Sequence, residues 1–209
     1  MHEKVLPRHS VELLTAMASD PPPQLTGWTL AGGTGLAFHF GHRVSDDLDF
    51  FRTDDMNVPR LHEVLVRYGA YETLQEAEHT LTVLIRDTKL SFFRVSDPFL
   101  FPSVPHRFFS VADVRDIALM KLAAISGRGS RKDFADMYFI LRDKPTLEAY
   151  FDLLPRKYGA HRVNLYHILK SLTYFEDAET EPMPRMLVPF DWKACKAFFV
   201  REARAIVLP

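Results

Sequence analysis

The sequence predicts an α+β protein, with a small mixed sheet in the N-terminal half and helices in the C-terminal half. Short β-rich runs separated by glycine turns fall before residue 97, whereas apolar residues recur at helical spacing from residue 110 onward. A proline-rich stretch separates the two patterns. We therefore expect a core domain over 1–105 and a helical region over 106–209.

The elements of the N-terminal half follow from local patterns of apolar residues and turn formers. The sequence predicts, in order, a helix over 8–18, a strand within 27–33, a helix over 34–41, a strand over 47–51, a helix over 57–69, a hairpin over 80–95 and an irregular stretch over 97–109.

The elements of the C-terminal half are helices, two of which begin with a capping-box pattern at Ser110 and Ser130. The sequence predicts helices over 111–127, 130–143, 145–157, 161–172 and 191–206, with an extended connection over 177–191.

Composition limits the functional classes. The 209 residues carry a net charge of −1, so no general basic field attracts nucleic acid, and a contact of that kind needs a local patch. A single cysteine, Cys195, excludes an intrachain disulfide and a cysteine-based zinc site. We find neither a signal-peptide pattern nor an apolar run of roughly 20 residues that could span a membrane. The chain is interpreted as soluble and cytoplasmic.

The stretch LAGGTGLAFHFGHRVSDDLDFF, residues 30–51, contains the most informative pattern. Asp47 and Asp49 lie on one face of a predicted strand, because side chains alternate between faces. Two adjacent carboxylates repel each other unless a cation binds between them, and Mg²⁺ (or Mn²⁺) suits such ligands. Upstream, Gly32, Gly33 and Thr34 open a helix whose N-terminus favours phosphate. The spacing indicates an NTP and metal site.

Other glycine-rich nucleotide motifs do not fit this stretch. Gly33 and Gly35 match the first part of G-x-G-x-x-G, but Phe38 occupies the third glycine position. The chain also has no G-x-x-x-x-G-K-[ST] sequence, so a P-loop is excluded.

Lys121 falls on the apolar stripe of the helix predicted over 111–127. A lysine there either extends its ammonium to the rim of the helix or reaches a carboxylate or phosphate, and both readings stay open. In the following helix, Asp133 is explained as the third helical position of the Ser130 capping box. Asp136 has no such explanation, so it is the preferred active-site acid.

Three basic residues form a local cluster around the start of that helix: Arg128, Arg131 and Lys132. The ordinary interpretation is a solvated loop and helix start. The functional interpretation is a contact with triphosphate or with an RNA acceptor, because planar guanidinium groups suit phosphate.

The blocks GGTGLAFHFGHRVSDDLDFF and MKLAAISGRGSRKDFADMYFIL resemble AbiEii-type nucleotidyltransferases, the toxins of abortive-infection toxin–antitoxin pairs. The resemblance implies a DNA polymerase β-like nucleotidyltransferase fold, a nucleotide contact by Lys121 and a final catalytic aspartate at Asp136. We therefore expect Mg²⁺-dependent transfer of a nucleoside monophosphate from an NTP to an acceptor hydroxyl. The acceptor stays open among an RNA 3′ end, a protein hydroxyl and a small molecule, and the resemblance suggests tRNA or another cellular target and a cognate antitoxin.

One expected residue is missing from the pattern. Enzymes of this superfamily commonly place a third carboxylate on a neighbouring strand, where this chain has Ser91. Either Asp136 supplies that acid, or fewer protein ligands suffice, or activity is reduced or lost. The alternative functions are therefore a catalytically silent scaffold that binds nucleotide or a partner protein, and a metal-dependent phosphodiesterase.

Overall fold

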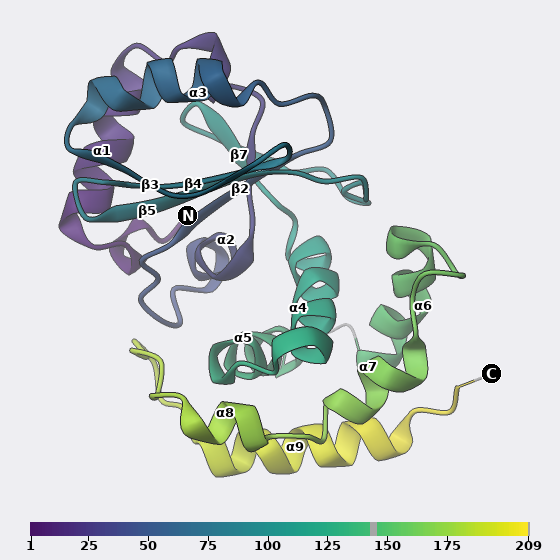
Figure 1. The fold of residues 1–209 in the computed structure, drawn as a ribbon. Coiled ribbons are helices and arrows are strands. Elements are labelled where there is room, and N and C mark those ends of the chain that lie inside the picture. Colours follow the sequence, from purple (N-terminus) through teal and green to yellow (C-terminus); the bar gives the residue numbers. More distant parts are fainter. Residues whose placement is uncertain (143–145, 209) are drawn as a thin grey trace. The chain divides into compact units, whose positions relative to one another are not determined.

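A computed structural model of the chain describes residues 1–142 and 146–208 and divides into two compact units, Met1–Asp113 and Val114–Pro209. The first unit contains a seven-stranded mixed sheet with helices, and the second consists of helices (Figure 1). The predicted α+β class is therefore confirmed.

The sheet of the first unit has the strand order β3-β4-β5-β2-β1-β7-β6. Two neighbouring pairs, β2 with β5 and β1 with β7, are parallel, and the other pairs are antiparallel. The strands are β1 Thr29–Leu30, β2 Leu48–Arg52, β3 Tyr71–Ala77, β4 Thr80–Ile85, β5 Thr88–Arg94, β6 Val104–His106 and β7 Phe109–Val111.

Helices cover both faces of this sheet, with α3 on one face and α2 on the other (Figure 1). The α-helices of the unit are α1 Arg8–Ser19, α2 Gly32–Phe40 and α3 Val58–Leu65. Three 3₁₀ turns accompany them: η1 Glu3–Val5, η2 Pro23–Leu25 and η3 Val66–Tyr68.

Alternation along β2 separates the core from the opposite face, as predicted. Leu48 and Phe50 are buried in the core, whereas Asp49 and Phe51 point to the other side and are half-buried. The neighbouring strand β5 follows the same rule, because Leu90 pairs with Leu48 and both are buried. We call the side that carries Asp49 the outer face of the sheet.

The predicted hairpin over 80–95 is confirmed as β4 and β5. Arg86 and Asp87 connect the strands with positive φ angles of 48° and 62°. Two such residues in succession form the tight turn that matches the twist of paired strands.

Two predictions for the end of the first unit are wrong. The stretch 97–109 is not wholly irregular, because β6 and the first residue of β7, Phe109, lie in its second half. Ser110 does not cap a helix but belongs to β7, where its N–H donates to the Trp28 carbonyl at 2.9 Å. Sheet pairing thus delays the next helix until Val114.

The second unit consists of six helices within its described residues: α4 Val114–Arg128, α5 Arg131–Arg142, α6 Leu147–Tyr158, α7 Leu165–Ser171, α8 Glu176–Thr180 and α9 Trp192–Ala205. Helix α4 packs against α5, α6 and α7, and α9 packs against α5. Asn164 and Asp191 cap α7 and α9 with their side chains. Residue 145, at the start of the helix predicted over 145–157, lies outside the described residues.

Two sequence-based expectations for this unit are corrected. The stretch 177–191 is not wholly extended, since α8 occupies its first part. Ser130 does not form the predicted capping box, because its hydroxyl donates to Glu181 at 2.7 Å. The Glu181 carboxylate also accepts the Arg131 N–H at 2.9 Å, so an acid distant in sequence caps α5.

Candidate active site

A glycine turn connects β1 to α2 in the first unit. Gly32 has φ +62°, a left-handed conformation that favours glycine. Helix α2 begins there and ends at Gly41, which is also left-handed with φ +63°. The N-cap residue of α2, Ala31, makes no side-chain capping bond, and the first backbone amides and the partial positive charge of this helix end suit an anion.

Asp49 lies directly against this turn. A Cβ atom added to Gly32 would be 2.8 Å from Asp49 Oδ2, so only glycine leaves room for the carboxylate. The backbone joins the two segments as well, because the Ala31 N–H donates to the Asp49 carbonyl at 3.0 Å. The structure thus brings the glycine turn and one of the paired acids together, as the sequence indicated.

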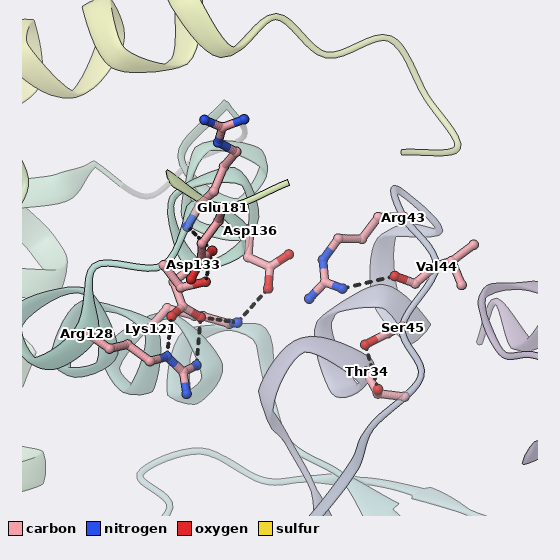
Figure 2. A network of polar contacts seen from close by, with 11 residues as sticks. Thr34, Arg43, Val44, Ser45, Lys121, Arg128, Asp133, Asp136 and Glu181 are labelled. Atoms are coloured by element: carbon pink, nitrogen blue, oxygen red, sulfur yellow. Dashed lines mark hydrogen bonds and ion pairs between the residues drawn. The ribbon is translucent and has the colours of Figure 1, made fainter. Parts of the chain in front are cut away.

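Gly33 is required for a different contact. A Cβ atom there would be 2.1 Å from an Arg43 Nη atom, so the guanidinium lies directly on the turn. Arg43 is buried, and it also donates to the Val44 carbonyl at 3.0 Å (Figure 2).

Thr34 holds the segment that carries Asp47. Its buried hydroxyl lies 2.8 Å from Ser45 Oγ (Figure 2). The same hydroxyl donates to the Asp47 carbonyl. The hydroxyl therefore bonds protein groups, and Thr34 fixes the backbone just before β2.

Asp47 itself is partly exposed, just before the first residue of β2. Lys89 Nζ lies 3.7 Å from Asp47 Oδ2, and both side chains are about two-fifths exposed, at 43% and 40%. A pair this exposed contributes at most about 1 kcal/mol, so a cation can displace the ammonium.

Ser91 occupies the position beside Asp49 where a third acid was expected. The two residues are direct neighbours in the parallel pairing of β2 and β5. Ser91 is 2% exposed, and its Oγ accepts a hydrogen bond from Thr82 at 3.3 Å. Next to Asp49, the outer face of the sheet therefore carries the neutral hydroxyl groups of Ser91 and Thr82.

The donor set of the first unit fits a hard divalent cation that keeps several waters. Asp47 and Asp49 offer carboxylate oxygens, and the missing side chain at Gly32 leaves space at Asp49 Oδ2. Within the described residues no group of three or more His, Cys, Asp or Glu side chains gathers as a metal site. The protein would therefore supply two ligands, with water and phosphate completing the shell.

The second unit places Lys121 between two buried acids. Its Nζ lies 2.8 Å from Asp133 Oδ1 and 2.6 Å from Asp136 Oδ2, from α4 to α5 (Figure 2). The lysine side chain is 5% exposed and both aspartates are fully buried. The Lys121 ammonium thus binds two carboxylates and does not extend to the rim of the helix.

Asp133 proves to be more than a capping residue. It also binds Arg128, whose Nε lies 2.7 Å from Asp133 Oδ2. Burial alone would raise the pKa of Asp133, but the Lys121 ammonium and the Arg128 guanidinium outweigh that effect and lower it. Asp133 therefore stays ionised.

The three residues of the basic cluster, Arg128, Arg131 and Lys132, lie in different environments. Arg128 binds Asp133, and Arg131 donates to the Ala178 carbonyl at 2.8 Å while its guanidinium lies 5.1 Å from the Trp192 ring centre. Lys132 is exposed. The first two side chains thus hold the second unit together.

Sequence reasoning passed over Asp133 because a familiar capping pattern explained it. The signal available was its spacing: Asp133 and Asp136 are three apart on one helix, so both carboxylates lie on the same side of α5. A buried lysine on the preceding helix needs at least one such partner.

Comparison with known proteins identifies a matching family and a protein of similar sequence. A family described as "Nucleotidyl transferase AbiEii toxin, Type IV TA system" matches residues 13–206. The uncharacterized protein aq_aa25 of Aquifex aeolicus (strain VF5) is 36% identical over 186 residues, covering 84% of this chain and 85% of that protein.

Two solved structures share the fold at 15% identity. The nucleotidyltransferase toxin MenT4 of Mycobacterium tuberculosis H37Rv has a TM-score of 0.57, with 95% of this chain and 82% of that chain covered. JHP933 from Helicobacter pylori has a TM-score of 0.52, with 97% and 89% covered. Among the described residues, every helix is too short or too polar to cross a membrane.

Proposed function

Because this chain belongs to the AbiEii family of nucleotidyltransferase toxins, we propose that it transfers a nucleoside monophosphate from an NTP to an acceptor hydroxyl, with Mg²⁺ or Mn²⁺ held by Asp47 and Asp49. The observation that carries the proposal is the contact between the Gly32 turn and Asp49 Oδ2. A backbone that suits phosphate and a carboxylate that suits a metal lie side by side there.

The geometry of the first unit supports the following proposed roles. The amides of Gly32 and Gly33 at the start of α2 bind the phosphates of the nucleotide. Thr34, through its bond to the Asp47 carbonyl, positions the first acid rather than the nucleotide. A bound divalent ion would supply charge neutralisation at the phosphates, and Lys89 would give up its ion pair with Asp47.

The second unit contributes Lys121 and Asp136 in this proposal. Lys121 contacts the nucleotide phosphates, and Asp136 orients Lys121 or accepts the proton of the acceptor hydroxyl. The ion pair at 2.6 Å supports a joint role. Asp133, which also binds Arg128, holds the ammonium in place. The sequence-based assignments of Arg128, Arg131 and Lys132 to nucleotide binding stay proposals.

Partners follow from the family as further proposals. We propose that the acceptor is an RNA or tRNA end, that modification inhibits growth, and that a cognate antitoxin counteracts the enzyme. The protein would act in the cytoplasm, where NTP and RNA are present.

The direct test is transfer of label. The protein is incubated with α-labelled NTPs, Mg²⁺ and total RNA or total protein, and Asp47→Asn and Asp49→Asn are compared with Asp46→Asn, a change of the exposed neighbouring acid. We expect each of the first two variants to lose on the order of 100-fold or more in rate, because several kcal/mol of charge stabilisation depend on the metal. Equal labelling by all four proteins would refute the assignment.

A catalytically silent scaffold is the second candidate, and Ser91 favours it. A neutral, buried hydroxyl occupies the position next to Asp49, where superfamily enzymes commonly have an acid. On this alternative, calorimetry would detect nucleotide binding that needs no Mg²⁺, and no acceptor would become labelled.

A further inference from the structure

Two phenylalanines lie on the outer face of the sheet, on the same strands as the acid and the serine of the candidate site. Phe51 follows Asp49 by two residues on β2, and Phe93 follows Ser91 by two residues on β5. The two are partners in the pairing of these strands, and their rings are stacked with centres 5.1 Å apart. We call Phe51 and Phe93 the aromatic pair.

Both residues of the aromatic pair are half-buried, so each is partly exposed. The same row of the sheet continues through Thr80 on β4 and Ala77 on β3, so it consists of uncharged side chains. An uncharged surface with two flat rings suits a planar aromatic group, whereas a phosphate or a charged peptide would find no partner in this row.

Along β2, Asp49 lies between the glycine turn and the aromatic pair. Strand β1 runs antiparallel to β2, with Thr29 beside Phe51, and it then leads past Asp49 into Gly32. The phosphate-binding end of the site is thus at the start of β2, and the aromatic pair is about 6.6 Å further along that strand than Asp49.

In-line displacement requires the attacking hydroxyl and the leaving pyrophosphate to lie on opposite sides of the reacting phosphorus. If the glycine turn holds the leaving phosphates, as proposed above, the acceptor approaches from the side of Phe51 and Phe93. The distance of two strand residues is about the reach from a terminal ribose hydroxyl to its own base.

We propose that Phe51 and Phe93 form a stacking site for the terminal base of a single-stranded nucleic-acid acceptor. The inference rests on the proposed function, and it names an acceptor subsite that the catalytic assignment alone does not supply. At the site the acceptor hydroxyl would form the new bond to the α-phosphorus, pyrophosphate would leave, and the hydroxyl proton would pass to a base or to water.

The test measures binding without turnover. A short single-stranded RNA with 2-aminopurine at its 3′ end serves as the probe, because stacking quenches the fluorescence of this base. The wild type should quench and bind the probe. Phe51→Leu and Phe93→Leu should weaken binding roughly 5- to 150-fold, the range that corresponds to the loss of one stacked base.

Two sets of control variants are available. Phe51→Tyr and Phe93→Tyr keep the ring and should retain binding. Phe108→Leu changes another partly buried ring of the same unit, next to β7 at the other end of the sheet order, and should bind as the wild type does. Thermal unfolding of every variant shows whether the fold is retained.

Each result decides a different question. Absence of probe binding by the wild type, or equal binding by wild type and Leu variants, overturns the proposal. A loss of NTP affinity without a loss of probe binding would reassign the pair to the base of the nucleotide, and a loss of stability alone would make it a structural cross-strand pair. Stacking that persists in Asp47→Asn, with no label transfer by the wild type, would retain the stacking site and refute the proposed function.

Discussion

Lys121 lies 2.8 Å from Asp133 and 2.6 Å from Asp136, and all three side chains are buried in the second unit. Such a cluster is a stability element in any case, because removing one member leaves buried charge uncompensated. The catalytic role proposed for it can be tested separately from that structural role, since α4 carries a second buried ion pair of similar geometry. Asp116 accepts a 2.8 Å bond from Lys157 of α6.

Replacing Lys121 by Met should lower both stability and activity, whereas Lys157→Met should lower stability alone. We expect each change to reduce the free energy of unfolding by about 3–5 kcal/mol, because each removes an ammonium that is bound to a buried carboxylate. Urea unfolding and label transfer measure the two effects. Lys121→Arg keeps the charge and should retain the fold while losing transfer. A Lys121→Arg enzyme with full activity would contradict the nucleotide contact.

The lowered pKa of Asp133 predicts how the stability of the fold depends on pH. The pKa is lowered from its ordinary value of 3.8, so the carboxylate stabilises the folded state above that value and loses its effect as pH falls through the lowered pKa. The difference in unfolding free energy between wild type and Asp133→Asn should therefore be largest near neutral pH and shrink below about pH 4.

Urea titrations at several pH values measure that difference. Asp152→Asn, at an exposed position of α6, is the control and should differ little from wild type at any pH. A difference between wild type and Asp133→Asn that grows as pH falls would contradict the assigned ion pairs.

Gly32→Ala should disturb the candidate metal site in addition to straining the backbone. The new Cβ would lie 2.8 Å from Asp49 Oδ2, so the carboxylate must move. Gly27→Ala is a matched control, because Gly27 also has a positive φ, +76°, but has no atom within 4 Å of the added Cβ. Both changes should cost about 1–2 kcal/mol of backbone strain. Only Gly32→Ala should weaken Mn²⁺ binding, as measured by calorimetry, and unchanged Mn²⁺ affinity would argue against Asp49 as a ligand.

Cys195 should report on opening of the second unit. It is fully buried on α9, and burial raises the pKa of its thiol, so the reactive thiolate is scarce. A thiol reagent should modify the native protein far more slowly than the urea-unfolded chain, in which one equivalent reacts. Rapid labelling of the native protein would show that α9 detaches from α5 readily.

The sequence by itself determined the elements that depend on local chemistry. Glycine turns set the start and end of α2, alternation placed Asp49 opposite the buried Leu48 and Phe50, and the hairpin of β4 and β5 followed from β-rich runs around a short turn. These features depend on neighbours along the chain, so spacing and residue type suffice to predict them.

Tertiary structure decided what distant segments supply. Ser110 became a strand residue because the Trp28 carbonyl, far away in sequence, accepts its N–H, and Ser130 lost its capping role because Glu181 takes over that end of α5. Asp133 became an ion-pair partner because α4 places Lys121 beside it. In each case a buried polar group takes the partner that folding brings to it, and local sequence carries no record of that partner.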